Sequence, residues 1–342
     1  MKKIIAVISS RGLPASYGGF ETLVNYLTLI SEKEFKDYIF LIGCEMHLKK
    51  NLFYRRNVKR IFASRFDGIG ALIFDLKIFF KCLFYKPTSF LYLGYTSAPF
   101  FSLLSLLGIN IVCNVDGFEW RRKKWGKLAK KYLKFCEYIC GISKSTLISD
   151  SLVIQRYYRY HFNKKTFLIR YGGDITDQIS NLEIKNYYLV VMRLEPENNI
   201  EVIFNSFMKS KSKKKLVIIG NKTKYFMDKI YPYIDKSRIN FLGPVYEKVR
   251  LAKLRSETFC YIHGHTVGGT NPSLVEACKF QRPIIAYKSL FNKEVLGKKA
   301  LFFKSMKDLK NIFEEKYEFL KPPKLGEDYD WNYITKEYIK LL

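Results

Sequence analysis

The sequence predicts an α/β protein built from two Rossmann-like, doubly wound domains that face each other across a cleft. Its 342 residues exceed what one hydrophobic core usually serves, so two domains of similar size are expected. Short apolar runs alternate with helical patterns in both halves of the chain, as they do in parallel sheets with crossover helices. Each half also carries a glycine-rich loop between a strand pattern and a helix pattern, where doubly wound sheets bind ligands.

The first half of the chain alternates between strand and helix patterns. Apolar, β-branched runs predict the strands, and apolar residues at three- and four-residue spacing predict the helices. The predicted strands are Lys3–Ser9, Tyr38–Cys44, Ser89–Leu93, Ile111–Val115, Tyr138–Ile142 and Thr166–Arg170. The predicted helices are Phe20–Ile30, Ile69–Tyr85, Pro99–Leu107, Lys123–Glu137 and Ser143–Tyr160.

The same alternation restarts after a polar stretch at 172–186. The predicted strands are Tyr187–Met192, Leu216–Gly220, Ile239–Leu242, Phe259–Ile262 and Pro283–Ala286, and the predicted helices are Ile200–Lys209, Tyr225–Ile234, Tyr246–Ser256 and Pro272–Phe280. We therefore place the first domain at residues 1–172 and the second at 173–324. Residues 325–342 read as a closing helix with Trp331, Ile334 and Tyr338 on one face, expected to pack back toward the first domain.

The composition indicates a protein of the cytoplasm. The seven cysteines are scattered through apolar runs without a C-x-x-C pair, which is typical of small, reduced core residues. No apolar stretch reaches the roughly 18 residues that a membrane span needs. The first three residues lead straight into a strand pattern, so we expect neither a span nor a signal peptide.

The formal net charge of +28 predicts an anionic partner. Nucleic acid, anionic lipid and phosphorylated small molecules are the three classes to consider, and the sequence contains no recognisable nucleic-acid-binding module. The densest basic run, Arg121–Lys134, contains no acid and carries Trp125 and Tyr132, a pattern typical of a membrane interface. The amphipathic segment Ile69–Lys86 could also lie on a bilayer, although its aromatic residues could equally face the core. We expect a peripheral protein at the inner face of the membrane.

The most informative stretch is Val267–Ala277, where adjacent glycines run directly into a helix pattern. Glycines allow a close approach of the backbone, Pro272 suits the first helical turn, and the unpaired N–H groups there favour an anion such as phosphate. Glu276 lies about one turn further on, where its carboxylate could accept hydrogen bonds from sugar hydroxyls. The alternative is an ordinary loop with a helix cap and a solvated glutamate.

A second glycine loop, within Ser9–Glu21, follows the first predicted strand. Gly12, Gly18 and Gly19 do not fit the G-x-G-x-x-G spacing, and no G-x-x-x-x-G-K-[ST] motif is present. A nicotinamide enzyme and a P-loop ATPase are therefore excluded as first choices. Two glycine loops at two helix N-termini suit a nucleotide diphosphate held between the domains.

Charged residues at predicted strand ends extend this site. Arg193 follows the strand Tyr187–Met192, and its guanidinium could bridge two phosphates, with a buried structural arginine as the alternative. Asp116 and Glu119 follow the strand Ile111–Val115, and either could orient an acceptor hydroxyl or stabilise positive charge on a sugar ring. The alternative is a turn at Asp116-Gly117 and a pair between Glu119 and Arg122.

Histidines do not predict a metal site here. His263 and His265 lack a third histidine or cysteine at ligand spacing, so His265 is expected to contact the ligand or to order its loop. No G-x-S-x-G elbow and no Ser/His/Asp set indicates a hydrolase.

Together these residues resemble glycosyltransferases of the GT-B architecture, family 4, in the bacterial branch of polysaccharide β-1,4-rhamnosyltransferases. The resemblance covers nearly the whole chain. It is carried by Arg11-Gly12-Leu13-Pro14 with Tyr17-Gly18-Gly19-Phe20-Glu21-Thr22, by Asp116-Gly117-Phe118-Glu119-Trp120 with Lys124-Trp125, by Glu195-Pro196-Glu197-Asn198-Asn199, by His263-Gly264-His265, and by Gly268-Gly269-Thr270-Asn271-Pro272-Ser273-Leu274.

The resemblance implies retaining transfer of a sugar from a nucleotide-diphosphate donor to a lipid-diphosphate-linked saccharide, with no cofactor and no obligatory metal. Gly18, Gly19 and Arg193 would hold the donor phosphates, Gly269 and Thr270 would contact sugar and phosphate through backbone groups, and Glu276 would take the ribose hydroxyls. The rest of the implied donor site consists of Asn198, Gly268, Asn271, Ser273 and Leu274. The implied catalytic residues are Asp116, Glu119 and His265.

Two departures from the broad family pattern concern this site. A glutamate common in the family would fall at Gly268, and a common lysine would fall at Asn198. Phosphate neutralisation is therefore expected to rest on Arg193 and on helix dipoles. The named branch shares both changes.

Three functions follow from this reading. The first is a glycosyltransferase of cell-surface polysaccharide synthesis, with rhamnose from dTDP-rhamnose as the expected sugar. The second is a nucleotide-sugar epimerase or hydrolase on the same fold. A basic nucleic-acid binder is the remote third, and we expect no nucleic-acid partner.

Overall fold

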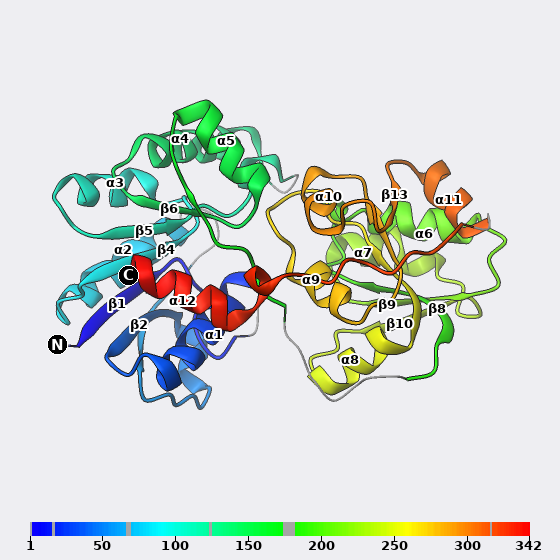
Figure 1. Cartoon of the computed structure of the whole chain (residues 1–342), viewed down its shortest axis with the longest axis horizontal. Coiled ribbons are helices and arrows are strands. Elements are labelled where there is room, and N and C mark those ends of the chain that lie inside the picture. The colour runs from blue at the N-terminus through cyan, green and yellow to red at the C-terminus, as the bar shows by residue number, and fades with distance from the viewer. Residues whose placement is uncertain (1, 16–17, 66–69, 123–124, 174–181, 315–316) are drawn as a thin grey trace. The chain divides into compact units, whose positions relative to one another are not determined.

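The computed structural model describes residues 2–15, 18–65, 70–122, 125–173, 182–314 and 317–342. The chain divides into two compact units (Figure 1). Unit 1 consists of Met1–Gly172 and Glu327–Leu342, and unit 2 consists of Gly173–Gly326. Each unit has its own parallel sheet and its own core, as the alternating sequence pattern predicts.

Unit 1 is built on a seven-stranded parallel sheet of order β3-β2-β1-β4-β5-β6-β7. Its strands are β1 (Lys3–Ile8), β2 (Tyr38–Glu45), β3 (Val58–Ala63), β4 (Ser89–Leu93), β5 (Ile111–Asn114), β6 (Thr146–Ser149) and β7 (Phe167–Leu168). Its α-helices are α1 (Gly19–Glu34), α2 (Gly70–Leu83), α3 (Ala98–Leu106), α4 (Lys127–Ile142), α5 (Leu152–Phe162) and α12 (Trp331–Leu341). The 3-10 helices are η1 (Met46–Lys50), η2 (Glu119–Arg121) and η5 (Glu327–Tyr329).

The strands of unit 1 are apolar because helices cover both faces of the sheet. On one face, side chains of β1, β2 and β4 form a single buried cluster with α1 and α12. On the other face, the ring centroids of Phe79 in α2 and Phe90 in β4 lie 4.9 Å apart, and those of Phe101 in α3 and Tyr92 in β4 lie 4.7 Å apart. All seven cysteines of the chain are buried and free, as the sequence predicts.

The closing helix α12 is part of unit 1. Asp330 caps it, accepting a hydrogen bond from the backbone N–H of Asn332 at 2.7 Å. Trp331 stacks on Tyr26 of α1 with a ring separation of 4.6 Å, and Asn114 of β5 donates to the Tyr338 hydroxyl at 2.6 Å. The chain therefore leaves unit 2 and returns to complete the unit 1 core.

Two parts of the unit 1 prediction are wrong. Tyr138–Ile142 is the last part of α4 rather than a strand, since burial at Leu133, Cys136 and Cys140 follows the helical period. The strand is β6, inside the segment predicted as a helix. The sequence does not predict strand β3. This edge strand contains the charged residues Lys59 and Arg60, so its pattern is typical of a polar loop.

Unit 2 is built on a six-stranded parallel sheet of order β10-β9-β8-β11-β12-β13. Its strands are β8 (Lys185–Val191), β9 (Lys215–Ile219), β10 (Ile239–Gly243), β11 (Thr258–His263), β12 (Ile284–Tyr287) and β13 (Leu301–Phe303). Its α-helices are α6 (Ile200–Met208), α7 (Lys224–Lys229), α8 (Lys248–Glu257), α9 (Pro272–Lys279), α10 (Leu290–Leu296) and α11 (Met306–Glu314), with 3-10 helices η3 (Pro196–Asn198) and η4 (Tyr231–Tyr233).

Helices cover both faces of the unit 2 sheet as well. Residues of α6, α7 and α11 share one buried cluster with alternate residues of β8, β9 and β11. On the opposite face, the Tyr187 hydroxyl donates to the Leu254 carbonyl of α8 at 2.7 Å, and the Tyr261 hydroxyl lies 2.7 Å from Ser273 Oγ of α9. Elements α10, β13 and α11 were not predicted, because β13 has only three residues and the surrounding sequence is rich in lysine.

Candidate active site

The predicted donor residues of unit 2 gather at the carboxyl edge of its sheet. Strand β8 has β9 on one side and β11 on the other, so the chain changes direction across the sheet between β8 and β11. At such a switch point the loops after the two strands diverge and leave room for a ligand. The loop after β8 carries Arg193 and Asn198, and the loop after β11 carries His265 and Gly268.

Two asparagines fasten these loops to each other. Asn198 Nδ2 donates to the Arg193 carbonyl at 2.7 Å, and its Oδ1 lies 2.5 Å from His265 Nδ1. Asn199 Nδ2 donates to the Gly264 carbonyl at 2.8 Å. A Cβ at Gly264 would lie 2.0 Å from the Asn198 carbonyl oxygen, so only glycine allows this approach. Asn198 is 3% exposed, and its amide joins the two loops, while its contact with a donor stays a prediction.

His265 is oriented by this contact. The Asn198 oxygen can only accept, so the proton of the imidazole lies on Nδ1. A Cβ at Gly268 would lie 3.1 Å from His265 Nε2, which places that nitrogen directly beside the glycine loop. His265 therefore lies beside the glycine loop, and its contact with a ligand stays a prediction.

The backbone of the glycine loop is fixed at both ends. Gly268 has φ +121°, a conformation that side-chain-bearing residues rarely adopt. The side chain of Asn271 accepts a hydrogen bond from the Ser273 N–H at 3.0 Å and caps α9, and Pro272 occupies the first helical position. Gly269 and Thr270 lie between these two fixed points and are buried.

Two predicted donor residues have structural tasks. Ser273 Oγ lies 2.7 Å from the Tyr261 hydroxyl and donates to the Val191 carbonyl at 3.2 Å, so it joins α9 to β8 and β11. The side chain of Leu274 is fully buried in unit 2. Both side chains are engaged inside unit 2, and the contacts of these two residues with a donor stay predictions.

Glu276 is held by a residue that the sequence did not single out. Its Oε2 lies 2.5 Å from Nη2 of Arg255 on α8, and the two side chains are 18% and 7% exposed, respectively. Arg255 Nη2 also donates to Ser273 Oγ at 3.4 Å. The carboxylate is therefore not the solvated glutamate of the alternative reading, since a buried guanidinium orients it.

Arg193 lies just beyond the end of β8 and is exposed. Its backbone carbonyl accepts hydrogen bonds from Asn198 and from the Glu195 N–H at 2.8 Å, which fixes the backbone beneath the side chain. The buried structural arginine of the alternative reading is excluded by this exposure. The guanidinium remains accessible for an anionic ligand.

Unit 1 carries the second glycine loop at the corresponding edge of its own sheet. Gly18 is the N-cap of α1, and Glu21 in the first turn accepts a hydrogen bond from the Arg11 N–H at 2.8 Å. Gly12 has φ +109°, and a Cβ there would lie 2.7 Å from Cys44 Cα. A Cβ at Gly19 would lie 3.4 Å from the Tyr171 hydroxyl. Residues 16–17, which belong to the motif, lie outside the described residues.

Asp116 and Glu119, the two acidic residues after β5, have different surroundings. Asp116 has φ +53° and is half-buried, and its N–H donates to Asn114 Oδ1 at 2.9 Å. Glu119 lies 2.5 Å from Arg122 Nε and accepts from Trp125 Nε1 at 2.9 Å. Both oxygens of Glu119 therefore contact its own loop, as in the alternative in which Glu119 pairs with Arg122, and its catalytic role stays a prediction. The basic residues Lys123 and Lys124 lie outside the described residues.

A buried acid that the sequence did not reveal lies under the carboxyl edge of the unit 1 sheet. Asp75 of α2 accepts hydrogen bonds from Ser9 Oγ at 2.7 Å and Ser97 Oγ at 2.5 Å. Burial raises the pKa of Asp75 to about 6, and the two serine hydrogen bonds oppose that rise. The carboxylate ties the loop after β1, where Ser9 has φ +68°, to the start of α3.

His263 is an uncharged residue of the unit 2 interior. It is 2% exposed, and burial lowers the pKa of its imidazole to about 3. Neither ring nitrogen has a hydrogen-bond partner among the residues placed in the structure. Within those residues, no group of three histidine, cysteine or acidic side chains could hold a metal ion.

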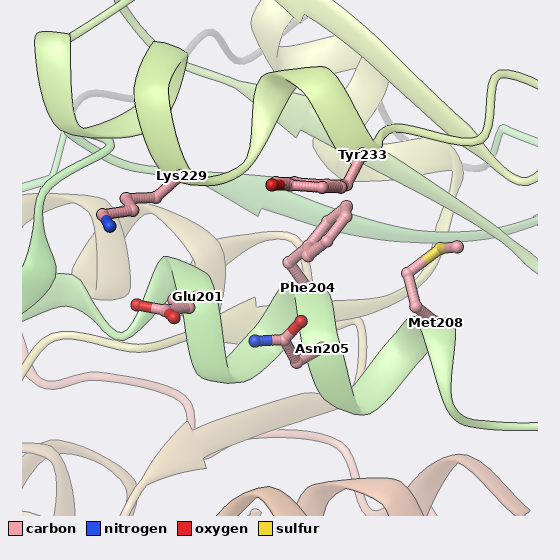
Figure 2. A pocket seen from close by; sticks show the side chains of 6 residues that line it. All are labelled: Glu201, Phe204, Asn205, Met208, Lys229 and Tyr233. Carbon is pink, nitrogen blue, oxygen red and sulfur yellow. The ribbon is translucent and has the colours of Figure 1, made fainter.

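Two shallow hollows lie away from the glycine loops. One, shown in Figure 2, runs between α6 and the α7–η4 segment, lined by Glu201, Phe204, Asn205, Met208, Lys229 and Tyr233. Glu201 is already bonded to the Tyr225 hydroxyl, and no predicted site residue lines this hollow. The other lies on unit 1 and is lined by Trp120, Arg121, Lys130, Lys131 and Lys134.

Solved structures share this architecture. HepE of Anabaena, solved in complex with UDP, is 14% identical, with a TM-score of 0.67, covering 91% of this chain and 88% of that chain. WaaG, a glycosyltransferase involved in lipopolysaccharide biosynthesis, is 9% identical, with a TM-score of 0.69, covering 98% of this chain and 95% of that chain. UDP-N-acetylglucosamine 2-epimerase from Rickettsia bellii is 15% identical, with a TM-score of 0.64, covering 100% of this chain and 96% of that chain.

The fold and the sequence of the second half define the class of protein. Two parallel sheets with interleaved helices match GT-B structures, and residues 174–330 match glycosyl transferases group 1. The chain is a glycosyltransferase of the GT-B architecture. It belongs to the family described as a domain of unknown function, DUF1972, which matches residues 1–174, just over half of the chain. No curated protein matches the chain.

Proposed function

We propose that the protein transfers rhamnose from dTDP-rhamnose to a lipid-diphosphate-linked saccharide in the synthesis of a cell-surface polysaccharide. The observation that carries the donor half is the glycine loop at the β8/β11 switch point, where Gly269 and Thr270 precede the N-terminus of α9. Arg193 supplies a fixed positive charge at the neighbouring strand end. The rhamnose and the thymidine nucleotide rest on the sequence resemblance.

In this proposal the residues have distinct roles. The N–H groups of the glycine loop and the Arg193 guanidinium bind the diphosphate, and Gly18 and Gly19 at the N-terminus of α1 are the proposed phosphate-binding residues of unit 1. His265 and Asp116 are the proposed catalytic residues, and in this proposal transfer needs no cofactor and no obligatory metal. Binding of the leaving diphosphate by dipoles and a guanidinium stabilises the negative charge that develops as the sugar departs.

Turnover of candidate donors tests this function. The purified protein is incubated with a panel of nucleotide sugars and a lipid-diphosphate-linked saccharide, and a glycosylated lipid should form with dTDP-rhamnose. Product from sugar conversion without the lipid would favour the epimerase or hydrolase reading. A folded protein that leaves every donor intact would contradict the proposal.

A glycine pair provides the matched control for that assay. Gly268 and Gly297 both lie in unit 2 with positive φ, at +121° and +57°, so alanine strains the backbone at both positions. Only Gly268 belongs to the glycine loop. We expect Gly268→Ala to abolish most turnover and Gly297→Ala to retain it, so equal losses in the two variants would speak against the loop as the donor site.

The acceptor half of the proposal rests on one face of unit 1. Helices α2, α3 and α4 pack side by side there. The ring centroids of Phe100 in α3 and Phe79 in α2 lie 4.9 Å apart, and the Tyr132 hydroxyl of α4 donates to the carbonyl of Thr96, just before α3, at 3.0 Å. Large apolar side chains are exposed on these three helices and directly after α2 and α3. We call this set of side chains the apolar face. They are Ile73, Phe80, Leu83, Phe84, Leu103, Leu106, Leu107, Leu128, Tyr132, Phe135, Tyr138 and Ile142.

Basic residues accompany the apolar face. Lys130, Lys131 and Lys134 of α4 line the hollow together with Trp120, and no ion pair engages these lysines within the part of unit 1 that is described. Each lysine near an anionic leaflet adds about 1 kcal/mol of attraction. The proposal is a peripheral protein at the inner face of the membrane, with the lipid diphosphate bound at this hollow. No described helix is both long and apolar enough to cross a bilayer.

Vesicle binding tests the apolar face. Phe84 and Leu107 are 87% and 72% exposed, so replacing both by serine removes apolar area without opening a cavity. We expect at least about tenfold weaker co-sedimentation with vesicles rich in phosphatidylglycerol, because each buried apolar side chain contributes about 1.5–3 kcal/mol. Leu52→Ser with Leu290→Ser, at 102% and 68% exposure outside this face, is the matched control. Equal loss in both double variants would remove the apolar face from the proposal.

A further inference from the structure

One buried carboxylate holds the loop after β1 to helix α2. Asp75 of α2 is 3% exposed, and its Oδ2 accepts hydrogen bonds from Ser9 Oγ at 2.7 Å and from Ser97 Oγ at 2.5 Å. Burial raises the pKa of Asp75 to about 6, so the carboxylate still carries its charge at neutral pH. A buried charge without hydrogen-bond donors is strongly unfavourable, so neither serine can turn away from it at low cost.

Ser9 has a backbone conformation that a tertiary contact has to hold. Its φ is +68°, in the left-handed region that a residue with a side chain rarely adopts. The turn follows directly on the last residue of β1 and sets the direction in which the chain enters the loop. The hydrogen bond to Asp75 is the contact of the Ser9 side chain that opposes the local preference for negative φ.

The path from Ser9 to the N-terminus of α1 is short. Two residues after Ser9, the N–H of Arg11 donates to Oε1 of Glu21 at 2.8 Å. Glu21 lies in the first turn of α1, two residues beyond Gly19. A rotation of the backbone at Ser9 would displace Arg11, and with it the hydrogen bond that ties the loop to this turn.

We infer that Asp75 is a positioning residue for the glycine loop of unit 1, acting through Ser9 and Arg11 on the N-terminus of α1. The carboxylate itself is buried beneath the loop and does not contact the donor in this role. Ser97 bonds to the same oxygen but precedes α3, so its hydroxyl has no part in this path. The inference rests on the proposed function, in which the glycine pair at α1 binds the donor diphosphate.

The direct test compares two alanine substitutions at one carboxylate oxygen. Ser9→Ala and Ser97→Ala each remove one hydroxyl that donates to Oδ2 of Asp75, and alanine has the same preference for negative φ as serine. We expect KM for the donor that is turned over to rise at least about fivefold in Ser9→Ala, with kcat within about twofold. Both constants should stay within about twofold in Ser97→Ala. Equal changes in KM in the two variants would overturn the inference.

A double-mutant cycle assigns the effect to Asp75. We expect Asp75→Ala to raise KM at least as much as Ser9→Ala, and Ser9→Ala to add less than about twofold in the Asp75→Ala background. Asp75→Asn keeps an acceptor oxygen for the serine hydroxyls, so KM should return to within about threefold of the unaltered protein. Multiplicative effects of the two alanine changes would contradict a path through Asp75. If Asp75→Ala does not fold, the two serine variants still decide.

Amide hydrogen exchange provides a readout that does not depend on turnover. We expect at least about tenfold faster exchange in peptides containing Arg11 in Ser9→Ala, and unchanged exchange in Ser97→Ala, because only the first change releases the loop. Unchanged exchange in both variants would overturn the inference.

The outcomes separate this inference from the proposed function. Turnover with an unchanged KM in Ser9→Ala overturns the inference and leaves the transferase proposal intact. A folded protein that turns over no donor overturns the proposed function, and the exchange comparison then decides whether Asp75 holds the loop. A higher KM and faster exchange in Ser9→Ala alone support both.

Discussion

Replacing Glu276 by alanine is expected to lower kcat/KM for the sugar donor by about 10- to 100-fold. The loss corresponds to a hydrogen bond between a ribose hydroxyl and a charged group, worth about 1.5–3 kcal/mol. The same change leaves Arg255, which is 7% exposed, without its counter-charge. We therefore also expect the free energy of unfolding to fall by about 3 kcal/mol. Donor kinetics and denaturant unfolding measure the two effects separately.

A second substitution separates binding from stability. In the double variant Glu276→Ala with Arg255→Met, no buried charge remains unpaired, so most of the lost stability should return while donor turnover stays low. If the double variant recovered activity along with stability, Glu276 would be a structural residue only. If Glu276→Ala alone retained full activity, Glu276 would not belong to the site.

Gly264→Ala is expected to destabilise unit 2 strongly. Its Cβ would lie 2.0 Å from the Asn198 carbonyl oxygen and 3.0 Å from Ile203, and neither neighbour can move without breaking a loop or the core. The two loops that flank the glycine site would have to separate, and Asn199 would lose its hydrogen bond to the Gly264 carbonyl. We expect a loss of at least about 3 kcal/mol in the free energy of unfolding, with loss of nucleotide binding.

Thermal and denaturant unfolding measure this effect against a matched glycine. Gly126 has no atom within 4 Å of the position where a Cβ would be added, so Gly126→Ala tests the chemistry of the substitution without the clash. We expect that control to cost less than about 1 kcal/mol. A Gly264→Ala variant as stable as the control would mean that the β8 and β11 loops are not fastened to each other as described.

The sequence was sufficient to predict most strands and helices because the parallel strands are buried on both faces and read as apolar runs. It failed where that signal is weak. Strand β3 carries Lys59 and Arg60 at an edge, and the end of α4 contains a β-branched apolar run that resembles a strand. Short apolar runs of this kind cannot be classified by periodicity alone.

At the site, the sequence could identify the glycine loop but not the partners of its side chains. Gly268 and Asn271 were found because backbone conformation and capping depend on neighbours in sequence. Arg255 is 21 positions from Glu276, and Asp75 lies 66 positions from Ser9, so tertiary packing alone brings each pair together. For the same reason, the tasks of Asn198 and Ser273 in joining loops could not be read from their spacing, whereas the pair between Glu119 and Arg122 is local in sequence and was the predicted alternative.

The most direct measurement is a crystal structure of the full chain with dTDP bound. The proposal predicts that the diphosphate accepts hydrogen bonds from the N–H groups of Gly269 and Thr270 and contacts the Arg193 guanidinium. It also predicts that a hydroxyl of the nucleotide's sugar donates to the Glu276 carboxylate while Oε2 stays paired with Arg255. A diphosphate bound elsewhere, such as at the basic hollow around Trp120, with the glycine loop empty, would contradict it.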